Sequence, residues 1–297
     1  NKWISILTCF AILYGTNLFY YSFGFNQMSH GYLFFLACLI MYTALRWNTL
    51  DDIKYLYWCF FFIGFATLVR PTEAVWALVP LLIGTVDFRS VKTRFAYFLN
   101  NKKVFISCIS FFLIPLSPQL FFWKIQTGKC FFYSYNDEGF FFFDPKFFQT
   151  LLSYHNGMLP YSPVLFFAIA GMATVFFKQR NIFNASVAFF IINTYILSSW
   201  WMWTYAASLG ARQYVQSYAL LSFPLASFFS IVCLKNTNSQ LVNRIKLLLV
   251  SIVIVALCRL NLLMAFQFKN SIIHWCGMNK EVYWLVFGKE HLSDEEW

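Results

Sequence analysis

Long runs of apolar residues are the feature that most restricts how this chain can fold. Nine such runs lie between short polar breaks, and many of them are close to the length that a helix needs to cross a bilayer. The runs do not alternate apolar and polar residues, which excludes the spans of a membrane β-barrel. Only 11% of the residues are charged, too few to cover a soluble protein of 297 residues. We therefore expect an all-α, polytopic transmembrane helix bundle.

The expected spans are 3–21, 30–47, 55–69, 71–86, 104–123, 163–177, 182–200, 213–234 and 247–268. The third and fourth spans meet at Arg70-Pro71. Because proline lacks an N–H and disfavours helix in the residue before it, we expect a tight reversal there. The chain starts at Asn1 without an initiator Met and without a signal-peptide pattern. We expect residues 1–297 to be one transmembrane domain, the C-terminal portion of a longer chain.

The basic residues predict which side of the membrane each loop occupies. Alternating the spans places thirteen basic residues on one side and eight on the other, with nine of the twelve acidic residues on the second side. The thirteen are Lys2, Arg46, Lys54, Arg89, Lys92, Arg94, Lys102, Lys103, Lys178, Arg180, Lys235, Arg244 and Lys246. The positive-inside rule makes their side cytoplasmic. The net charge of +10 is thus a topology signal, and no nucleic-acid partner is expected.

The eight cysteines show no metal-ligand spacing, and no metal or cofactor is expected. Six of them lie inside the expected spans, where cysteine acts as a small apolar packing residue. Cys130 and Cys276 lie on the outer side. They are either a disulfide or two free thiols, and the sequence leaves both open.

Two outer segments are longer than a turn requires, in addition to the outer tail 269–297. In the loop 124–162, four phenylalanines precede Asp144-Pro145, which we expect to start a short helix lying in the membrane interface. The alternative is an aromatic belt that only anchors the protein. The second segment runs from Trp200-Trp201 through small residues to Arg212-Gln213, where a guanidinium at a helix start makes an anion site. Arg212 taken alone is equally compatible with contacting lipid headgroups.

Several other polar residues are candidates for a site on the outer side. Arg70 and Glu73 flank the reversal, where a simple ion pair is the structural alternative. Asp137-Glu138 supplies paired acids that are otherwise solvated, and His30 is either a ligand or a hydrogen-bonded packing residue. Arg259 lies about 20 Å along its helix from Lys246. A charge within the membrane is a candidate functional site by default.

The sequence lacks every common nucleotide-binding signature, including GxxxxGK[ST], GxGxxG and DxD. A transferase working at the outer face therefore needs a donor that is not a nucleotide sugar. A lipid-linked sugar meets this condition, because its polyprenyl tail stays in the bilayer and its phosphate lies at the interface. The leaving phosphate needs cations, and the acceptor hydroxyl needs a carboxylate base.

The order of these features resembles the bacterial polytopic glycosyltransferases of the GT-C superfamily. The stretches that carry the resemblance are 15–21, Met28-Ser29-His30, 69–72, 139–141 with 144–146, Gly157 with Tyr161-Ser162-Pro163, and Trp200-Trp201 with Gly210, Arg212 and Gln213. The tail, with His274-Trp275 and Lys280-Glu281, is also similar to the Bacteroidetes-type mannosyl/arabinosyltransferase-like branch. The chain departs from the pattern at His155-Asn156 and at Glu73.

The resemblance implies transfer of a sugar from a polyprenyl-phosphate donor to a glycan, lipid or protein acceptor at the periplasmic face of the bacterial inner membrane. Arg212, Arg70 and Arg259 would then bind the donor phosphate. The cavity would be lined by His30, Glu73, Asp137, Glu138, His155, Tyr161, Trp201 and Gln213. The superfamily's catalytic carboxylate lies in the first outer loop, which would precede Asn1. The alternatives from other classes are a transporter or flippase for lipid-linked sugars and a non-catalytic membrane subunit.

The topology predicts opposite labelling of two loops. Cysteine tags within 87–103 should be protected from membrane-impermeant thiol reagents, because the positive-inside rule places that loop in the cytoplasm. Tags within 124–162 should react. The reverse pattern, measured on intact cells, would invert the sidedness of every candidate site.

Overall fold

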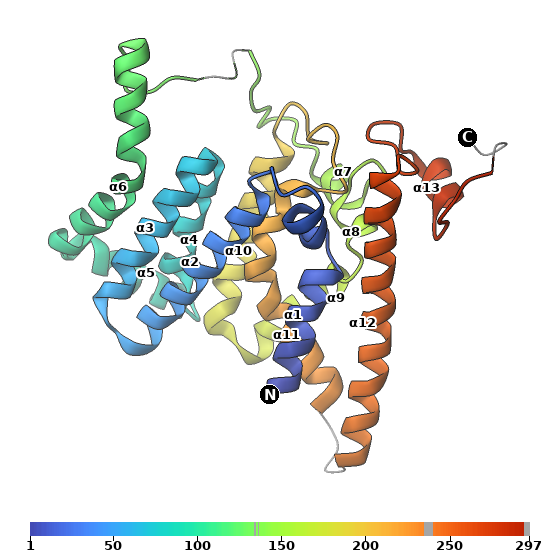
Figure 1. Ribbon diagram of the computed structural model, residues 1–297. Helices are drawn as coiled ribbons and strands as arrows, with labels where there is room; N and C mark the ends of the chain where they lie inside the picture. The colour runs from blue at the N-terminus through green and yellow to red at the C-terminus, as the bar shows by residue number, and fades with distance from the viewer. Residues whose placement is uncertain (134, 136, 235–239, 294–297) are drawn as a thin grey trace. The chain divides into compact units, whose positions relative to one another are not determined.

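The computed structural model describes residues 1–133, 135, 137–234 and 240–293. Within these residues the chain is helical and contains no strand (Figure 1). Lys235, which the topology counts as cytoplasmic, and residues 294–297 of the outer tail lie outside the described part.

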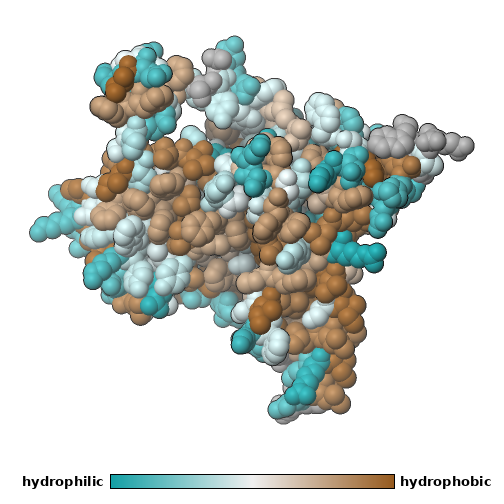
Figure 2. Space-filling model, viewed as in Figure 1, coloured by the Kyte–Doolittle hydropathy of each residue, from teal (hydrophilic) through white to brown (hydrophobic). Residues whose placement is uncertain are grey.

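Five helical stretches are long and apolar enough to cross a membrane: α2 (His30–Leu50), α6 (Lys102–Thr127), α10 (Arg180–Ser198), the stretch Arg212–Cys233 and α12 (Gln240–Lys269). The stretch Arg212–Cys233 joins the 3-10 helix η3 (Arg212–Ser217) to α11 (Tyr218–Leu234). The chain is therefore a helical membrane protein. The exposed flank of α12 shows as a nearly continuous apolar band in Figure 2, as expected of a helix that faces lipid.

Four other apolar helices occupy the remaining predicted spans but have only 10–17 residues: α1 (Lys2–Tyr14), α3 (Ile53–Val69), η2 with α4 (Pro71–Leu82) and α9 (Leu165–Lys178). The first predicted span is interrupted, since α1 ends at Tyr14 and a π-helix, η1 (Tyr20–Gly24), follows. Five spans are thus supported by length and composition, and nine spans remain a prediction. The predicted break at Arg70-Pro71 is confirmed: α3 ends at Val69, Arg70 is extended and η2 starts at Pro71.

Helix α5 (Phe88–Asn100) occupies most of the segment 87–103, which was predicted to be a basic cytoplasmic loop. Its apolar residues recur at helical spacing between basic ones, so the helix is strongly amphipathic. Asp87 caps its first turn by accepting a hydrogen bond from the Ser90 N–H at 2.7 Å, and the Ser90 hydroxyl completes the capping box.

A short helix lies in the loop for which an interfacial helix was predicted, but it begins later than expected, and its place in the membrane interface remains a prediction. Helix α7 covers only Phe147–Leu152, its N-cap residue is Lys146, and Asp144 does not cap it. Asp144 instead pairs with the Lys146 ammonium at 2.6 Å. The phenylalanines before Asp144 have non-helical backbone, because Phe140 forms a β-bridge with Trp200 and the Phe141 N–H donates to the Ser199 carbonyl. The chain therefore becomes helical only after this pairing ends.

The chain forms two compact units, each built from separated segments. Unit 1 comprises 1–31, 144–174 and 202–297, and unit 2 comprises 32–143 and 175–201. One core of unit 2 gathers Trp47, Leu56, Phe98 and Cys108 from α2, α3, α5 and α6.

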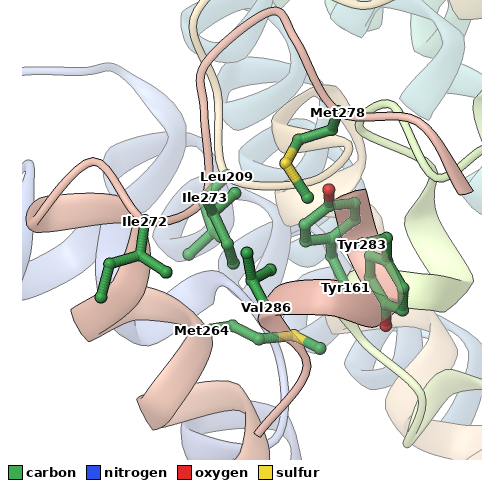
Figure 3. Close-up of a cluster of buried hydrophobic side chains, with 8 residues drawn as sticks. All are labelled: Tyr161, Leu209, Met264, Ile272, Ile273, Met278, Tyr283 and Val286. Atoms are coloured by element: carbon green, nitrogen blue, oxygen red, sulfur yellow. The ribbon is translucent and has the colours of Figure 1, made fainter. Parts of the chain in front are cut away.

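A core of unit 1 joins α8 (Met158–Tyr161), α12 and α13 (Lys280–Val286) (Figure 3). In it the rings of Tyr161 and Tyr283 pack edge to face, with centroids 5.7 Å apart. The Gln267 side-chain amide donates hydrogen bonds of 2.6 Å to the carbonyls of Val286 and Lys289. The predicted outer tail is therefore folded onto the end of α12.

Cys130 and Cys276, for which the sequence left a disulfide open, are both free thiols in this structure. Four of the six cysteines expected to pack inside spans are buried. Cys9 and Cys38 are exposed instead, because they lie on the outward faces of α1 and α2.

One glycine in each unit, Gly64 in unit 2 and Gly171 in unit 1, allows two helices to approach closely. A Cβ added to Gly64 of α3 would lie 2.1 Å from the Phe112 carbonyl oxygen of α6, and one on Gly171 of α9 would lie 2.1 Å from the Pro224 carbonyl oxygen of α11. Such contacts are typical of membrane helices, where small residues let backbones pack together.

Gly64→Ala should therefore destabilise the protein by about 1–3 kcal/mol, because the contacting atom is backbone and α3 must move away from α6. Without that contact, alanine in a helix would be the more stable residue. Thermal unfolding in detergent measures the change. Gly139→Ala is the control, since an added Cβ there meets nothing within 4 Å, and equal stability of both variants would contradict the close packing.

Candidate functional site

The predicted site residues belong to both units. Unit 1 contains His30, His155, Tyr161, Arg212, Gln213 and Arg259, and unit 2 contains Arg70, Glu73, Asp137, Glu138 and Trp201.

A buried asparagine organises the polar interior of unit 1. The Asn17 side-chain amide donates to the Leu209 carbonyl at 2.9 Å, and its oxygen accepts from the Tyr218 hydroxyl at 2.8 Å. The Asn17 backbone N–H donates to the Ser162 hydroxyl at 3.3 Å. Asn17 is 1% exposed, so each of these bonds is made away from water. One residue thus ties the end of the first predicted span to α11, to the turn after α8 and to the loop before Arg212.

The loop before Arg212 is held by further side chains. The Leu209 N–H donates to the Tyr21 hydroxyl at 2.8 Å, and the Ser208 hydroxyl donates to the Gly210 carbonyl at 3.1 Å. Gly210 has a φ of +61°, and an added Cβ would lie 2.6 Å from Tyr161 Cβ. Glycine is required here both by the left-handed backbone and by the closeness of Tyr161.

Arg212 begins the stretch Arg212–Cys233 and is half-buried. Its backbone N–H donates to the Gly210 carbonyl at 2.8 Å, and its Nη1 lies 3.8 Å from Met28 Sδ. His30 is buried, and its ring packs edge-on against Tyr21 with centroids 5.2 Å apart. The structure therefore brings Arg212 to the segment that contains Met28 and His30, two stretches that the resemblance linked only by their order.

Two consecutive residues of the same loop, Tyr205 and Ala206, have positive φ angles of 56° and 54°. Each such residue other than glycine costs about 1–3 kcal/mol, and clusters of them are typical of functional segments. The Asn156 side-chain amide holds the loop by donating to the carbonyls of Thr204 and Ala206 at 3.4 and 3.2 Å. This strained loop leads directly to Gly210 and Arg212.

Gln213 offers the site a hydrogen-bond acceptor, and His155, another residue predicted to line the cavity, has an uncharged imidazole. Gln213 is fully buried; its amide lies 3.4 Å from the Trp203 carbonyl, and its Oε1 accepts no hydrogen bond from the described residues. It is therefore an acceptor available to a hydroxyl or N–H group. Burial lowers the pKa of His155, so its imidazole is neutral at physiological pH and adds no positive charge.

Arg259 occupies a different place in unit 1. It is exposed on α12, ten residues before the helix end at Lys269, or about 15 Å along the axis. With Leu262, Leu263, Phe266 and Glu290 it lines a cavity of about 350 Å³. Arg212 is not among the residues lining that cavity.

In unit 2, Arg70 and Glu73 lie at the helix break. Their closest charged atoms are 3.9 Å apart, and Glu73 is buried. The Trp76 indole N–H donates to Glu73 Oε2 at 3.0 Å, and Trp76 packs on Phe189 with ring centroids 4.3 Å apart. These contacts give Glu73 a structural role in the turn.

The two outer segments singled out in the sequence meet within unit 2. The Phe141 N–H donates to the Ser199 carbonyl at 2.6 Å, and the Trp201 N–H donates to the Gly139 carbonyl at 3.0 Å. Phe140 and Trp200 form the β-bridge between them, with ring centroids 4.8 Å apart. Asp137 and Glu138 precede this pairing and are exposed, which matches the solvated alternative for these acids.

Six residues that hold the unit 1 site had no role predicted from the sequence. Three of them, Asn17, Tyr21 and Ser162, lie in stretches that carry the resemblance, and the other three are Asn156, Ser208 and Tyr218. Polar residues inside or beside apolar runs were the available signal. Among the described residues, no group of three or more His, Cys, Asp or Glu side chains could hold a metal ion.

Comparisons of the chain with protein-family models, with curated proteins and with solved structures find no significant match.

Replacing Asn17 with leucine should lower the free energy of unfolding by about 1–3 kcal/mol, because the buried Leu209 carbonyl loses its hydrogen bond and the Tyr218 hydroxyl loses one of its two side-chain partners, Asn17 and Ser162. Thermal unfolding in detergent measures this loss. Asn270→Ala removes an exposed asparagine from the same unit and should change stability by less than about 0.5 kcal/mol. An Asn17→Leu protein as stable as wild type would show that the network does not organise unit 1.

Proposed function

We propose that the chain is part of a GT-C-type glycosyltransferase that transfers a sugar from a polyprenyl-phosphate donor to an acceptor at the outer face of a bacterial inner membrane. The observation that carries the proposal is the position of Arg212. It lies half-buried at a helix start, at the end of a strained loop and beside Met28, within a polar network inside a membrane protein. The resemblance supplies the donor class.

A phosphate fits the Arg212 end of this site. A guanidinium presents several N–H donors in a fixed plane, which suits two oxygens of one phosphate. The helical stretch that starts at Arg212 adds the partial positive charge of its first N–H groups. The polyprenyl tail would remain in the hydrocarbon, where exposed apolar helix faces such as that of α12 receive it (Figure 2).

The sugar would lie next to the phosphate. Gln213 follows Arg212 directly, and its Oε1 would accept a hydrogen bond from a sugar hydroxyl. Because Gln213 is buried, the loop 203–211 must open to admit the sugar. The positive φ angles of Tyr205 and Ala206 are a local strain that a rearrangement of this loop would relieve.

The reaction needs a carboxylate that takes the proton of the acceptor hydroxyl. The hydroxyl oxygen then forms a bond to the anomeric carbon, the bond from that carbon to the phosphate oxygen breaks, and the phosphate leaves with its charge held by Arg212. Glu73 is already hydrogen-bonded to Trp76, and Asp137 and Glu138 are exposed. We assign the base to none of them, since the resemblance places it before Asn1.

Binding of polyprenyl phosphate is therefore the direct test for this chain. Arg212→Ala should weaken binding about tenfold or more, because one charge-assisted interaction is lost. Arg212→Lys should restore binding only in part, since an ammonium cannot contact two oxygens in one plane. The measurement is a titration in detergent, with uncharged polyprenol as the control ligand.

Arg244→Ala is the matched control, because Arg244 is an exposed arginine of the same unit. It should bind polyprenyl phosphate like wild type. Unchanged binding by Arg212→Ala would exclude the phosphate site. In a longer chain that includes the upstream outer loop, movement of a lipid-linked sugar across the membrane without sugar transfer would instead favour a flippase.

A further inference from the structure

Unit 2 contains a second cavity that the proposed transfer reaction does not use. It has a volume of about 550 Å³ and lies where the end of α2 and the turn after α4 meet α5. Its lining includes Asp51, Asp87, Arg89 and Arg94. The volume is in the range of small-molecule sites.

Helix α5, which forms one wall of this cavity, has the features of a helix at a membrane surface. Helix α5 ends at Asn100 and the membrane-spanning candidate α6 begins at Lys102, so a single residue separates the two helices. Phe88 and Leu99 at its two ends are 73% and 70% exposed. A helix that combines exposed apolar side chains with basic ones is typical of the lipid headgroup region.

The cavity wall is rigid. The Arg94 guanidinium lies 4.2 Å from the ring centroid of buried Trp47 and donates to Asn48 Oδ1 at 3.1 Å and to the Ile83 carbonyl at 3.3 Å. Gly84 has a φ of +83°, and its N–H donates to the Asn181 carbonyl at 2.6 Å. These contacts fix Arg94 and the adjoining turn before any ligand binds.

The four charged residues carry both signs. In the described part of the chain, none of them forms an ion pair within 4.0 Å. The hydrogen bond from the Ser90 N–H lowers the pKa of the Asp87 carboxyl group, so this group stays ionised at neutral pH, as an ordinary aspartate does. Two carboxylates and two guanidinium groups therefore line one cavity, and their charges are available to a ligand.

We propose that this cavity binds the headgroup of an ethanolamine phospholipid from the surrounding leaflet. The phosphate would lie between Arg89 and Arg94, and the ammonium would donate hydrogen bonds to Asp51 and Asp87. A glycerol headgroup offers the carboxylates no positive charge, and a choline headgroup has no N–H to donate. The acyl chains would lie along the exposed apolar side chains of α5.

The test compares lipids that differ only in headgroup. The protein is delipidated in detergent and placed in nanodiscs containing equal amounts of dioleoyl phosphatidylethanolamine, phosphatidylcholine and phosphatidylglycerol. After repurification, native mass spectrometry counts the lipids that stay bound. We expect the ethanolamine lipid to be retained about tenfold over the other two, the difference given by one charge-assisted hydrogen bond.

Two variants separate the two halves of the headgroup. Arg89→Gln should lower retention of the ethanolamine lipid about tenfold. Asp51→Asn should remove the preference over phosphatidylglycerol; asparagine tolerates the φ of 54° at this position, so the turn is preserved. Lys92→Gln is the control, because Lys92 carries the same charge on the same helix but does not line the cavity.

Equal retention of the three lipids by wild type would overturn the proposal. A loss in Lys92→Gln as large as that in Arg89→Gln would also overturn it, since binding would then be general attraction to a basic helix. Unfolding temperatures measured alongside confirm that each variant is folded. None of these outcomes depends on Arg212 or on sugar transfer.

Discussion

In the hydrocarbon of a bilayer, and wherever protein excludes water, every backbone N–H and C=O that is not in a helix must find a partner within the protein. This constraint explains why the polar residues of unit 1 lie where they do. The loop 203–211 has no helix to satisfy its backbone, and side chains of Asn17, Tyr21 and Asn156 bond to it instead. In unit 2, the segments around Phe140 and Trp200 meet the same requirement by pairing with each other.

The hydrogen bonds that satisfy the backbone of the loop 203–211 also position Arg212. A loop fixed by buried side chains can hold strained residues such as Tyr205 and Ala206, and it presents Arg212 at a helix start in a defined place. The polar residues that make the fold possible in the membrane thus also position the guanidinium proposed to bind the donor phosphate.

The class of the protein could be predicted from sequence, because a long continuous apolar run can cross a membrane only as a helix. The break at Arg70-Pro71 was also predictable, since proline acts on its immediate neighbours. The start of α7 was not, because Asp144-Pro145 resembles a helix start locally while the pairing of Phe140 with Trp200 is long-range. Helix α5 was not predicted, because the basic residues between its apolar ones made the segment look like a charged loop.

For the site, the sequence indicated Arg212, His30 and Gln213. The central role of Asn17 could not be predicted, because a single asparagine in an apolar run gives no sign of which distant groups it will contact.

The central claim is that a phosphate held by a membrane lipid binds at Arg212. It is tested most directly by photo-crosslinking with a polyprenyl phosphate that carries a diazirine next to its phosphate, followed by mass spectrometry of the labelled peptides. The account predicts adducts in the loop 203–212 and in the segment 21–30, with competition by unlabelled polyprenyl phosphate and none by polyprenol. Adducts confined to the cavity at Arg259, or to unit 2, would contradict it.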